Sequence, residues 1–150
     1  MTKPWILYGA NGYTGELIAR AAAEQGLRPI LAGRNKPAIE KLAGELGLEA
    51  RVFGLADADA LAGHIEGASL VLHTAGPFSA TSEPMLTGCL RARAHYLDIT
   101  GEIAVFEACK ARDAEARARG VVVLPGVGFD VVPSDCLARA LAEALPGAVK

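Results

Sequence analysis

The chain has 150 residues, of which 51% are hydrophobic and 21% charged, and its net charge is −2. This composition is typical of one globular domain and excludes disordered and fibrous classes. There is no basic excess, and no apolar run approaches the ~20 residues of a membrane span. We therefore expect neither nucleic acid nor a membrane as a partner. Three widely spaced cysteines form no CxxC pair, which predicts free thiols, no metal site and a cytoplasmic location.

Strand-like and helix-like segments alternate along the whole chain. Short apolar runs predict strands at 4–10, 28–34, 49–55, 68–76, 94–100 and 121–126. Amphipathic stretches predict helices at 14–25, 37–46, 57–65, about 82–93, 103–119 and 133–145. Because the strand segments are nearly all apolar, we expect strands that are buried on both faces. The pattern predicts an α/β fold, a Rossmann-type doubly wound, mainly parallel sheet of about six strands with helices on both faces.

The first strand runs into a glycine-rich loop that opens the first helix. Gly9, Gly12 and Gly15 are spaced by three residues. Gly9 suits the tight turn, Gly12 lets a pyrophosphate approach the backbone, and Gly15 lets the helix pack closely on the sheet. N–H groups at a helix start bind phosphate, so the loop predicts a dinucleotide site; a turn that binds nothing is the alternative. The further predicted phosphate ligands are Asn11, Tyr13 and Thr14.

The same glycine spacing occurs in short-chain reductases, which use a Tyr-x-x-x-Lys pair. The residues four positions after Tyr8, Tyr13 and Tyr96 are a glycine, a leucine and a threonine. The absence of a tyrosine–lysine pair weighs against that catalytic mechanism.

The end of the second strand distinguishes between the two nicotinamide cofactors. NAD binding needs an acidic residue about 20 positions after the glycines, but the sequence there reads LAGRN. Arg34 can pair with a 2′-phosphate through charge-assisted hydrogen bonds, with Gly33 making room and Asn35 assisting. A solvated surface arginine is the alternative. The absent carboxylate is the stronger half of this reasoning, which favours NADP(H) over NAD(H).

The loops after the later strands lie at the same predicted sheet edge. Thr74, Ala75 and Gly76 allow the backbone to approach the second half of the cofactor, Pro77 stiffens the turn, and Phe78 packs on the nicotinamide side or simply anchors the loop. The candidates for a catalytic acid or a substrate-orienting group are Asp98, Glu102 and Asp130.

These acidic residues also have structural interpretations. Asp130 and Ser134 fit helix N-capping, and Glu102 fits a favourable charge at a helix N-terminus. The three histidines show no metal-ligand spacing with the cysteines, and we expect none of them to be catalytic; His73 falls within a buried strand.

Five motifs occur in order along the chain: YGANGYTG, AGR, AGPF, YLDITGE and GFDVVPSD. In this combination the chain, from about Trp5 to Leu145, resembles the N-terminal domain of the saccharopine dehydrogenase-like oxidoreductases, including the trans-acting enoyl reductase branch. The resemblance implies a Rossmann domain that binds NADP(H) through the glycine loop, Arg34 and the loop at 75–78. It also implies a second, α+β domain that completes the substrate site and often forms a homodimer. Residues 1–150 would then be one domain of a longer protein.

The expected function is that of the NADP(H)-binding domain of such an oxidoreductase. The whole protein would transfer a hydride to or from a C=N, C=O or C=C bond of a small-molecule substrate. The alternative is a non-catalytic NADP(H)-binding redox sensor or partner-binding module, because no recognised catalytic set lies within these 150 residues. The sequence leaves the substrate, the reaction direction and the oligomeric state open.

Overall fold

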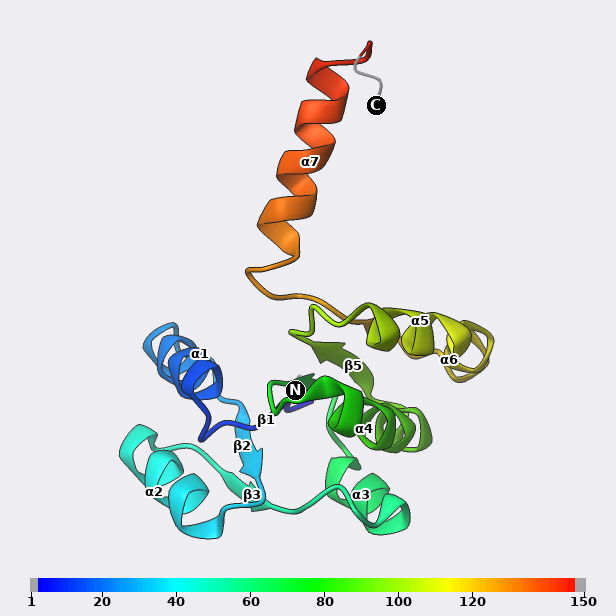
Figure 1. Ribbon diagram of the computed structural model, residues 1–150. Helices are drawn as coiled ribbons and strands as arrows, with labels where there is room; N and C mark the ends of the chain where they lie inside the picture. Colours follow the sequence, from blue (N-terminus) through cyan, green and yellow to red (C-terminus); the bar gives the residue numbers. More distant parts are fainter. Residues whose placement is uncertain (1–2, 148–150) are drawn as a thin grey trace.

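The computed structural model describes residues 3–147, apart from the side chains of residues 58 and 59. Strands and helices follow one another in the predicted order (Figure 1). The strands are β1 (Ile6–Tyr8), β2 (Ile30–Gly33), β3 (Ala50–Val52), β4 (Leu70–His73), β5 (His95–Asp98) and β6 (Val123–Leu124). The helices are α1 (Tyr13–Glu24), α2 (Lys36–Leu46), α3 (Ala58–Ile65), α4 (Phe78–Ala92), α5 (Ile103–Ala111), α6 (Asp113–Arg119) and α7 (Val132–Ala144). None of these described helices combines the length and hydropathy that a bilayer span requires.

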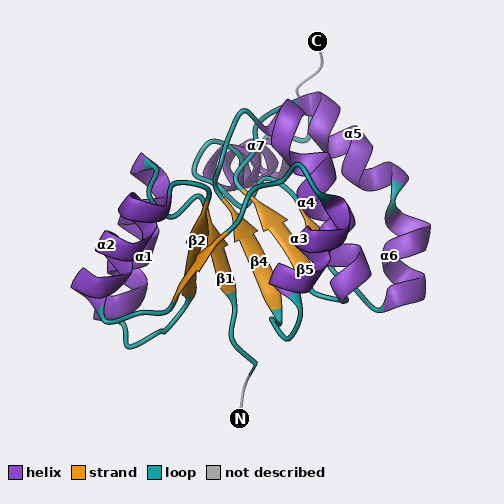
Figure 2. Ribbon diagram, turned by 90° about the horizontal axis from the view of Figure 1, so that it is seen from below, coloured by secondary structure: helices purple, strands orange, loops and turns teal. Residues whose placement is uncertain are grey.

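Within the described residues the strands form one parallel sheet, in the order β3-β2-β1-β4-β5-β6. Helices α1 and α2 cover one face, and helices α3 to α6 cover the other (Figure 2). Successive residues of β1 alternate between these layers: Leu7 packs with α1 and α2, whereas Ile6 and Tyr8 belong to the core beneath α3, α4 and α5. The predicted Rossmann-type doubly wound fold is confirmed.

The central strands and the edge strands differ in burial. All residues of β1 and β2 are buried, as the apolar runs predict. Strand β3, by contrast, has no fully buried residue, and Leu124 of β6 is 49% exposed. The expectation that every strand is buried on both faces is therefore wrong for β3 and β6, because each lies at an edge of the sheet and has a neighbour on one side only. It holds only in part for β4 and β5, whose residues alternate between half-buried and buried.

Two helix boundaries differ from the sequence-based expectation. Helix α4 begins at Phe78 rather than near Ser82, and Pro84 lies inside it. The segment expected to form one helix at 103–119 is divided at Arg112 into α5 and α6. The Arg112 guanidinium contacts Glu83 of α4 at 2.6 Å and Glu115 of α6 at 2.6 Å, so it links both segments to the neighbouring helix.

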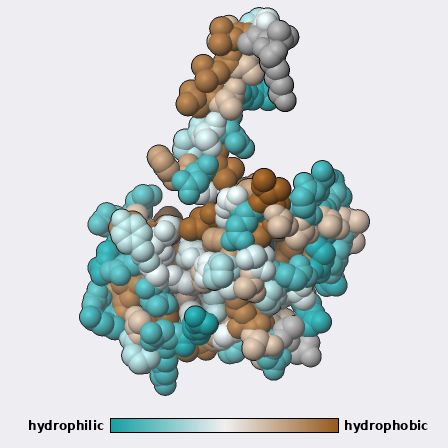
Figure 3. Space-filling model, in the orientation of Figure 1, coloured by the Kyte–Doolittle hydropathy of each residue, from teal (hydrophilic) through white to brown (hydrophobic). Residues whose placement is uncertain are grey.

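Helix α7 stands away from the sheet and its covering helices (Figure 1). It has no buried residue. Leu137 and Leu141 of α7 and its C-cap residue, Leu145, are exposed apolar side chains. Hydrophobic surface extends along the projecting helix (Figure 3). The helix carries Pro133 in its first turn, as expected.

Candidate functional site

The predicted cofactor residues meet at the carboxyl ends of β1, β2 and β4, which are adjacent in the sheet. In open α/β sheets ligands bind at this edge, where the strand order reverses. Here the reversal falls between β1 and β4, because β2 and β3 extend from β1 in one direction while β4, β5 and β6 extend in the other.

Two of the three loop glycines are required by the fold itself. Gly9 has a φ of +86°, and a Cβ on it would lie 2.8 Å from the Ala75 nitrogen. A Cβ on Gly15 would lie 2.2 Å from the Gly9 carbonyl oxygen and 2.9 Å from Ala10 Cα. The loop therefore folds back on the first turn of α1 and touches the loop after β4. Both contacts leave no room for a side chain.

Gly12 differs from the other two glycines. Its φ is −81°, and a Cβ on it would meet only the Gly9 oxygen, at 3.3 Å. It is the N-cap of α1, and Glu16 N donates to its carbonyl at 2.8 Å. The N–H groups of Tyr13, Thr14 and Gly15 therefore have no acceptor within the helix. This exposed helix start, without a Cβ at its cap, fits a pyrophosphate.

Arg34 lies exposed just after β2. Within residues 3–147 its side chain has no hydrogen bond or ion pair. Burial raises the pKa of the nearby Tyr8 hydroxyl, and the positive charge of Arg34 opposes that rise. The guanidinium is thus an unpaired cation at the end of β2, which fits a phosphate.

Asn11, Gly33 and Asn35 surround Arg34 in different ways. A Cβ on Gly33 would lie 3.0 Å from Asn11 Oδ1, so the glycine loop and the end of β2 are in close contact. Asn35 caps α2 by accepting a hydrogen bond from Ala38 N at 3.2 Å. Its predicted role beside Arg34 therefore competes with a structural one.

The loop after β4 is held by hydrogen bonds on several sides. Thr74 donates from both N and Oγ1 to the Tyr8 carbonyl, at 2.8 and 2.9 Å. The Thr81 hydroxyl lies 2.7 Å from the Ala75 carbonyl and 3.0 Å from the Pro77 carbonyl. Sequence reasoning missed Thr81, because it precedes the expected start of its helix and nothing in the motif marks it.

Glu102 binds the other end of this loop. Its two carboxylate oxygens accept hydrogen bonds from Phe78 N at 2.8 Å and Ser79 N at 2.9 Å, the first two N–H groups of α4. A carboxylate at a helix N-terminus also interacts favourably with the helix dipole. Glu102 thus ties the start of α4 to the loop after β5, and each of its oxygens accepts one of these two bonds. The Phe78 ring packs edge-on against His73, with ring centroids 5.3 Å apart.

We expect Glu102→Gln to lower the free energy of unfolding by about 1–2 kcal/mol. An amide oxygen can accept from one of the two N–H groups, while the amide nitrogen cannot accept from the other. Urea unfolding at neutral pH measures the change. Glu107→Gln on the exposed face of α5 is the matched control. Equal unfolding midpoints for the two variants would contradict the assignment.

Asp98 is fully buried at the end of β5. Its carboxylate accepts hydrogen bonds from Tyr96 Oη at 2.6 Å, Thr100 N at 3.0 Å and Gly126 N at 2.9 Å. Burial, and then the hydrogen bond to Asp98, raise the pKa of Tyr96 far above its ordinary value. Asp98 therefore joins the loops after β5 and β6 from inside the protein, and no oxygen of it faces solvent.

Asp130 differs from the other two acidic candidates in being exposed. The expected N-caps at the start of α7 are not found. The N-cap residue is Val131, without a side-chain cap bond, and the Ser134 hydroxyl donates back to the Asp130 carbonyl at 2.8 Å. The prediction that Asp130 and Ser134 cap this helix is wrong, because Asp130 lies before the cap and Ser134 bonds a carbonyl behind it.

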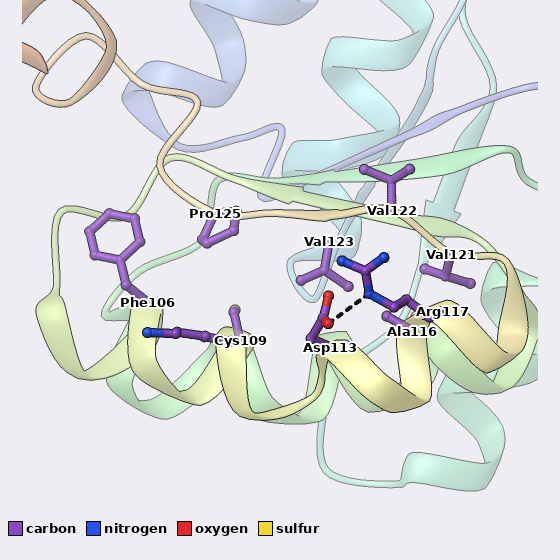
Figure 4. A pocket seen from close by; sticks show the side chains of 10 residues that line it. Phe106, Cys109, Asp113, Ala116, Arg117, Val121, Val122, Val123 and Pro125 are labelled. Atoms are coloured by element: carbon purple, nitrogen blue, oxygen red, sulfur yellow. Dashed lines mark hydrogen bonds and ion pairs between the residues drawn. The ribbon is translucent and has the colours of Figure 1, made fainter.

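A groove of about 460 Å³ lies elsewhere, between α5, α6 and β6 (Figure 4). Phe106, Cys109, Val121, Val123 and Pro125 line it, and Arg117 Nε donates to Asp113 at 2.7 Å. Burial raises the pKa of the Cys109 thiol to about 11, so the protonated thiol predominates at neutral pH. The groove shares no residue with the predicted cofactor site.

The chain is similar to several curated proteins over most of its own length. It is 34% identical over 138 residues to a trans-acting enoyl reductase of Mycobacterium leprae, covering 87% of this chain and 33% of that protein. It is 33% identical over 138 residues to a trans-acting enoyl reductase of Mycobacterium bovis, covering the same shares. The chain thus spans about a third of the length of these relatives.

Two solved structures share the fold. Apo saccharopine dehydrogenase (L-Glu forming) from Saccharomyces cerevisiae gives a TM-score of 0.81 at 16% identity, covering 95% of this chain and 31% of that one. Triphenylmethane reductase of Citrobacter sp., complexed with NADP(H), gives 0.62 at 18% identity, covering 81% and 48%. At these identities the likeness concerns the fold alone.

The family described as the saccharopine dehydrogenase NADP binding domain matches residues 5–124. This range includes the glycine loop, Arg34, the loop after β4, and both β5 and β6. NADP(H) is accordingly the cofactor of the domain, as the sequence predicts. The chain belongs to the saccharopine dehydrogenase NADP-binding domain family.

Proposed function

We propose that this domain binds NADP(H) across the carboxyl ends of β1, β2 and β4. The glycine loop and the start of α1 would hold the pyrophosphate, Arg34 the 2′-phosphate, and the loop at 74–78 the nicotinamide half. The observation that carries the proposal is the exposed Arg34, unpaired within residues 3–147, at the same sheet edge as the start of α1, which no described side chain caps. Both features are suited to anionic groups of one ligand.

The activity that this domain supports is hydride transfer on a small-molecule substrate, for which the nicotinamide ring supplies the hydride chemistry. The relatives named as trans-acting enoyl reductases favour a C=C bond, and the saccharopine dehydrogenase likeness keeps C=N and C=O bonds as candidates. A homodimer stays a prediction. The three free thiols support a reducing, cytoplasmic location.

Asp98 and Glu102 hold the loops in this proposal, since their carboxylates accept hydrogen bonds from internal donors. Asp130 is then the accessible acidic candidate for donating a proton or orienting the substrate. The same occupancy favours the second candidate function, a non-catalytic NADP(H)-binding module. NADPH oxidation with enoyl, imine and carbonyl compounds distinguishes the two. The sensor function predicts tight NADPH binding without turnover by the whole protein.

We expect Arg34→Ala to weaken NADPH binding by 1.5–3 kcal/mol, about 10- to 150-fold, and to leave NADH binding unchanged. The reason is that only NADPH carries the 2′-phosphate. Calorimetric titration of both nucleotides against wild type and variant measures the change.

The control for this experiment is Arg28→Ala, which removes a second exposed arginine before β2, at the opposite end of the strand. It should alter neither affinity. A parallel loss of NADPH and NADH affinity in Arg34→Ala would show that Arg34 does not recognise the 2′-phosphate.

A further inference from the structure

The Thr81 hydroxyl is the meeting point of three polar groups. It lies 2.7 Å from the Ala75 carbonyl oxygen, 3.0 Å from the Pro77 carbonyl oxygen and 3.0 Å from His73 Nε2. Carbonyl oxygens only accept hydrogen bonds, and the hydroxyl has one proton. We assign that proton to the nearer carbonyl, that of Ala75, and His73 Nε2 is then the donor to Thr81.

The surroundings of the His73 ring favour its role as a hydrogen-bond donor to Thr81. Its side chain is fully buried, and Nδ1 has no hydrogen-bond partner among the described residues. Since Nε2 carries the proton, Nδ1 is a bare acceptor, which costs less to bury than an unpaired N–H. Burial lowers the pKa of His73 to about 4, so the neutral ring with Nε2–H persists at neutral pH.

The hydrogen bond from Thr81 also sets the direction of the next amide group. In a planar trans peptide the C=O and the following N–H point in opposite directions. Because the Ala75 carbonyl points to Thr81 of α4, the Gly76 N–H points away from α4. Within residues 3–147 this N–H has no hydrogen-bond acceptor.

We propose that Thr81, held by His73, is a positioning residue that presents the Gly76 N–H as a donor to the nicotinamide half of bound NADP(H). The inference rests on the proposed function, because it takes the loop at 74–78 to contact that half of the cofactor. Neither residue touches the ligand. Both act through the orientation of one peptide group.

The test compares two ligands on the 150-residue chain: NADPH, and adenosine 2′,5′-bisphosphate, which contains the adenine half alone. Thr81→Val keeps the side-chain shape and removes the hydroxyl. It should weaken NADPH binding about fivefold and leave adenosine 2′,5′-bisphosphate within twofold of wild type. Thr81→Ser, which keeps the hydroxyl, should bind both ligands like wild type. A purely structural role would not separate the two ligands.

Thr87→Val is the matched control, since Thr87 lies on the same helix and its hydroxyl bonds Glu83 at 3.2 Å, away from the loop. Should Thr81→Val fail to fold by circular dichroism, His73→Leu removes the donor behind Thr81 and should give the same separation. Unchanged NADPH affinity, an equal loss for both ligands, or a loss in Thr81→Ser would overturn the proposal. If wild type binds neither ligand, the proposed function fails instead.

Discussion

Replacing Gly15 by alanine should lower the free energy of unfolding by about 3 kcal/mol or more. The added Cβ would lie 2.2 Å from the Gly9 carbonyl oxygen and 2.9 Å from Ala10 Cα, and both are backbone atoms of the strand-to-helix turn. Because the clashing atoms belong to the backbone, no side-chain rotation can relieve the contact. Helix α1 must therefore shift away from the sheet. A loss of this size is a large part of the 5–15 kcal/mol that stabilises a typical domain.

Urea unfolding of Gly15→Ala, Gly12→Ala and Gly44→Ala separates this clash from the general effect of the substitution. Gly44 lies within α2 with no atom within 4 Å of the added Cβ, so its alanine variant should gain about 0.5–1 kcal/mol. Gly12→Ala should cost less than about 1 kcal/mol yet weaken NADPH binding, because its methyl group enters the phosphate cradle. Similar stabilities for Gly15→Ala and Gly12→Ala would refute the close packing described for α1.

The protein should lose about 3 kcal/mol of stability between pH 6.5 and pH 4 through His73 alone. The folded-state pKa of His73 is lowered to about 4 by burial, from an ordinary value of 6.5. Between these values the unfolded chain binds the proton and the folded protein does not. The stabilising contribution is therefore complete above pH 6.5 and decreases as the pH falls toward 4.

The groups around His73 do not offset this loss. Tyr8 and Tyr96 face its ring with centroids 5.6 and 6.4 Å away, and Phe78 packs edge-on. Asp98, which pairs with His73 on the neighbouring strand β5, accepts hydrogen bonds from Tyr96 and from two backbone amides. Free energies of unfolding from urea titrations at several pH values give the slope for wild type and for His73→Leu.

Both proteins contain the same carboxylates, so the contribution of these groups to the pH dependence cancels when one slope is subtracted from the other. His64→Leu, which removes a half-exposed histidine stacked on Phe53, is the matched control for replacing a histidine by leucine. If His73→Leu retains the full dependence between pH 4 and 6.5, the buried neutral ring is not its source.

The sequence predicted the sheet and the glycine loop because both depend on local patterns. Apolar runs locate β1, β2 and β4, and the roles of Gly9 and Gly15 follow from the strand–loop–helix setting. The start of α4 could not be found in the same way. Proline is a common helix-start signal, but α4 begins six residues before Pro84. At that point the Glu102 carboxylate accepts hydrogen bonds from the first two N–H groups of the helix.

The acidic residues show the same limit. Asp98 and Glu102 are candidates for catalysis in the sequence because Asp98 ends β5 and Glu102 lies in the loop after it, at the ligand-binding edge of the sheet. Their partners, such as Gly126 and Phe78, are more than 20 positions away in sequence. A spacing pattern gives the position of a carboxylate along the strand, whereas its hydrogen-bond donors are set by the packing of separate loops.

The isolation of α7 has a consequence for cooperativity. Since no residue of this helix is buried, packing against the rest of the domain contributes little to its formation. Its helix–coil equilibrium is then governed by local terms, such as the Arg139–Glu143 pair at 2.8 Å, and helices of this length are marginal in water on their own. We therefore expect the cooperative unit that unfolds in a single transition to end near residue 131, and α7 to melt in a separate and more gradual process.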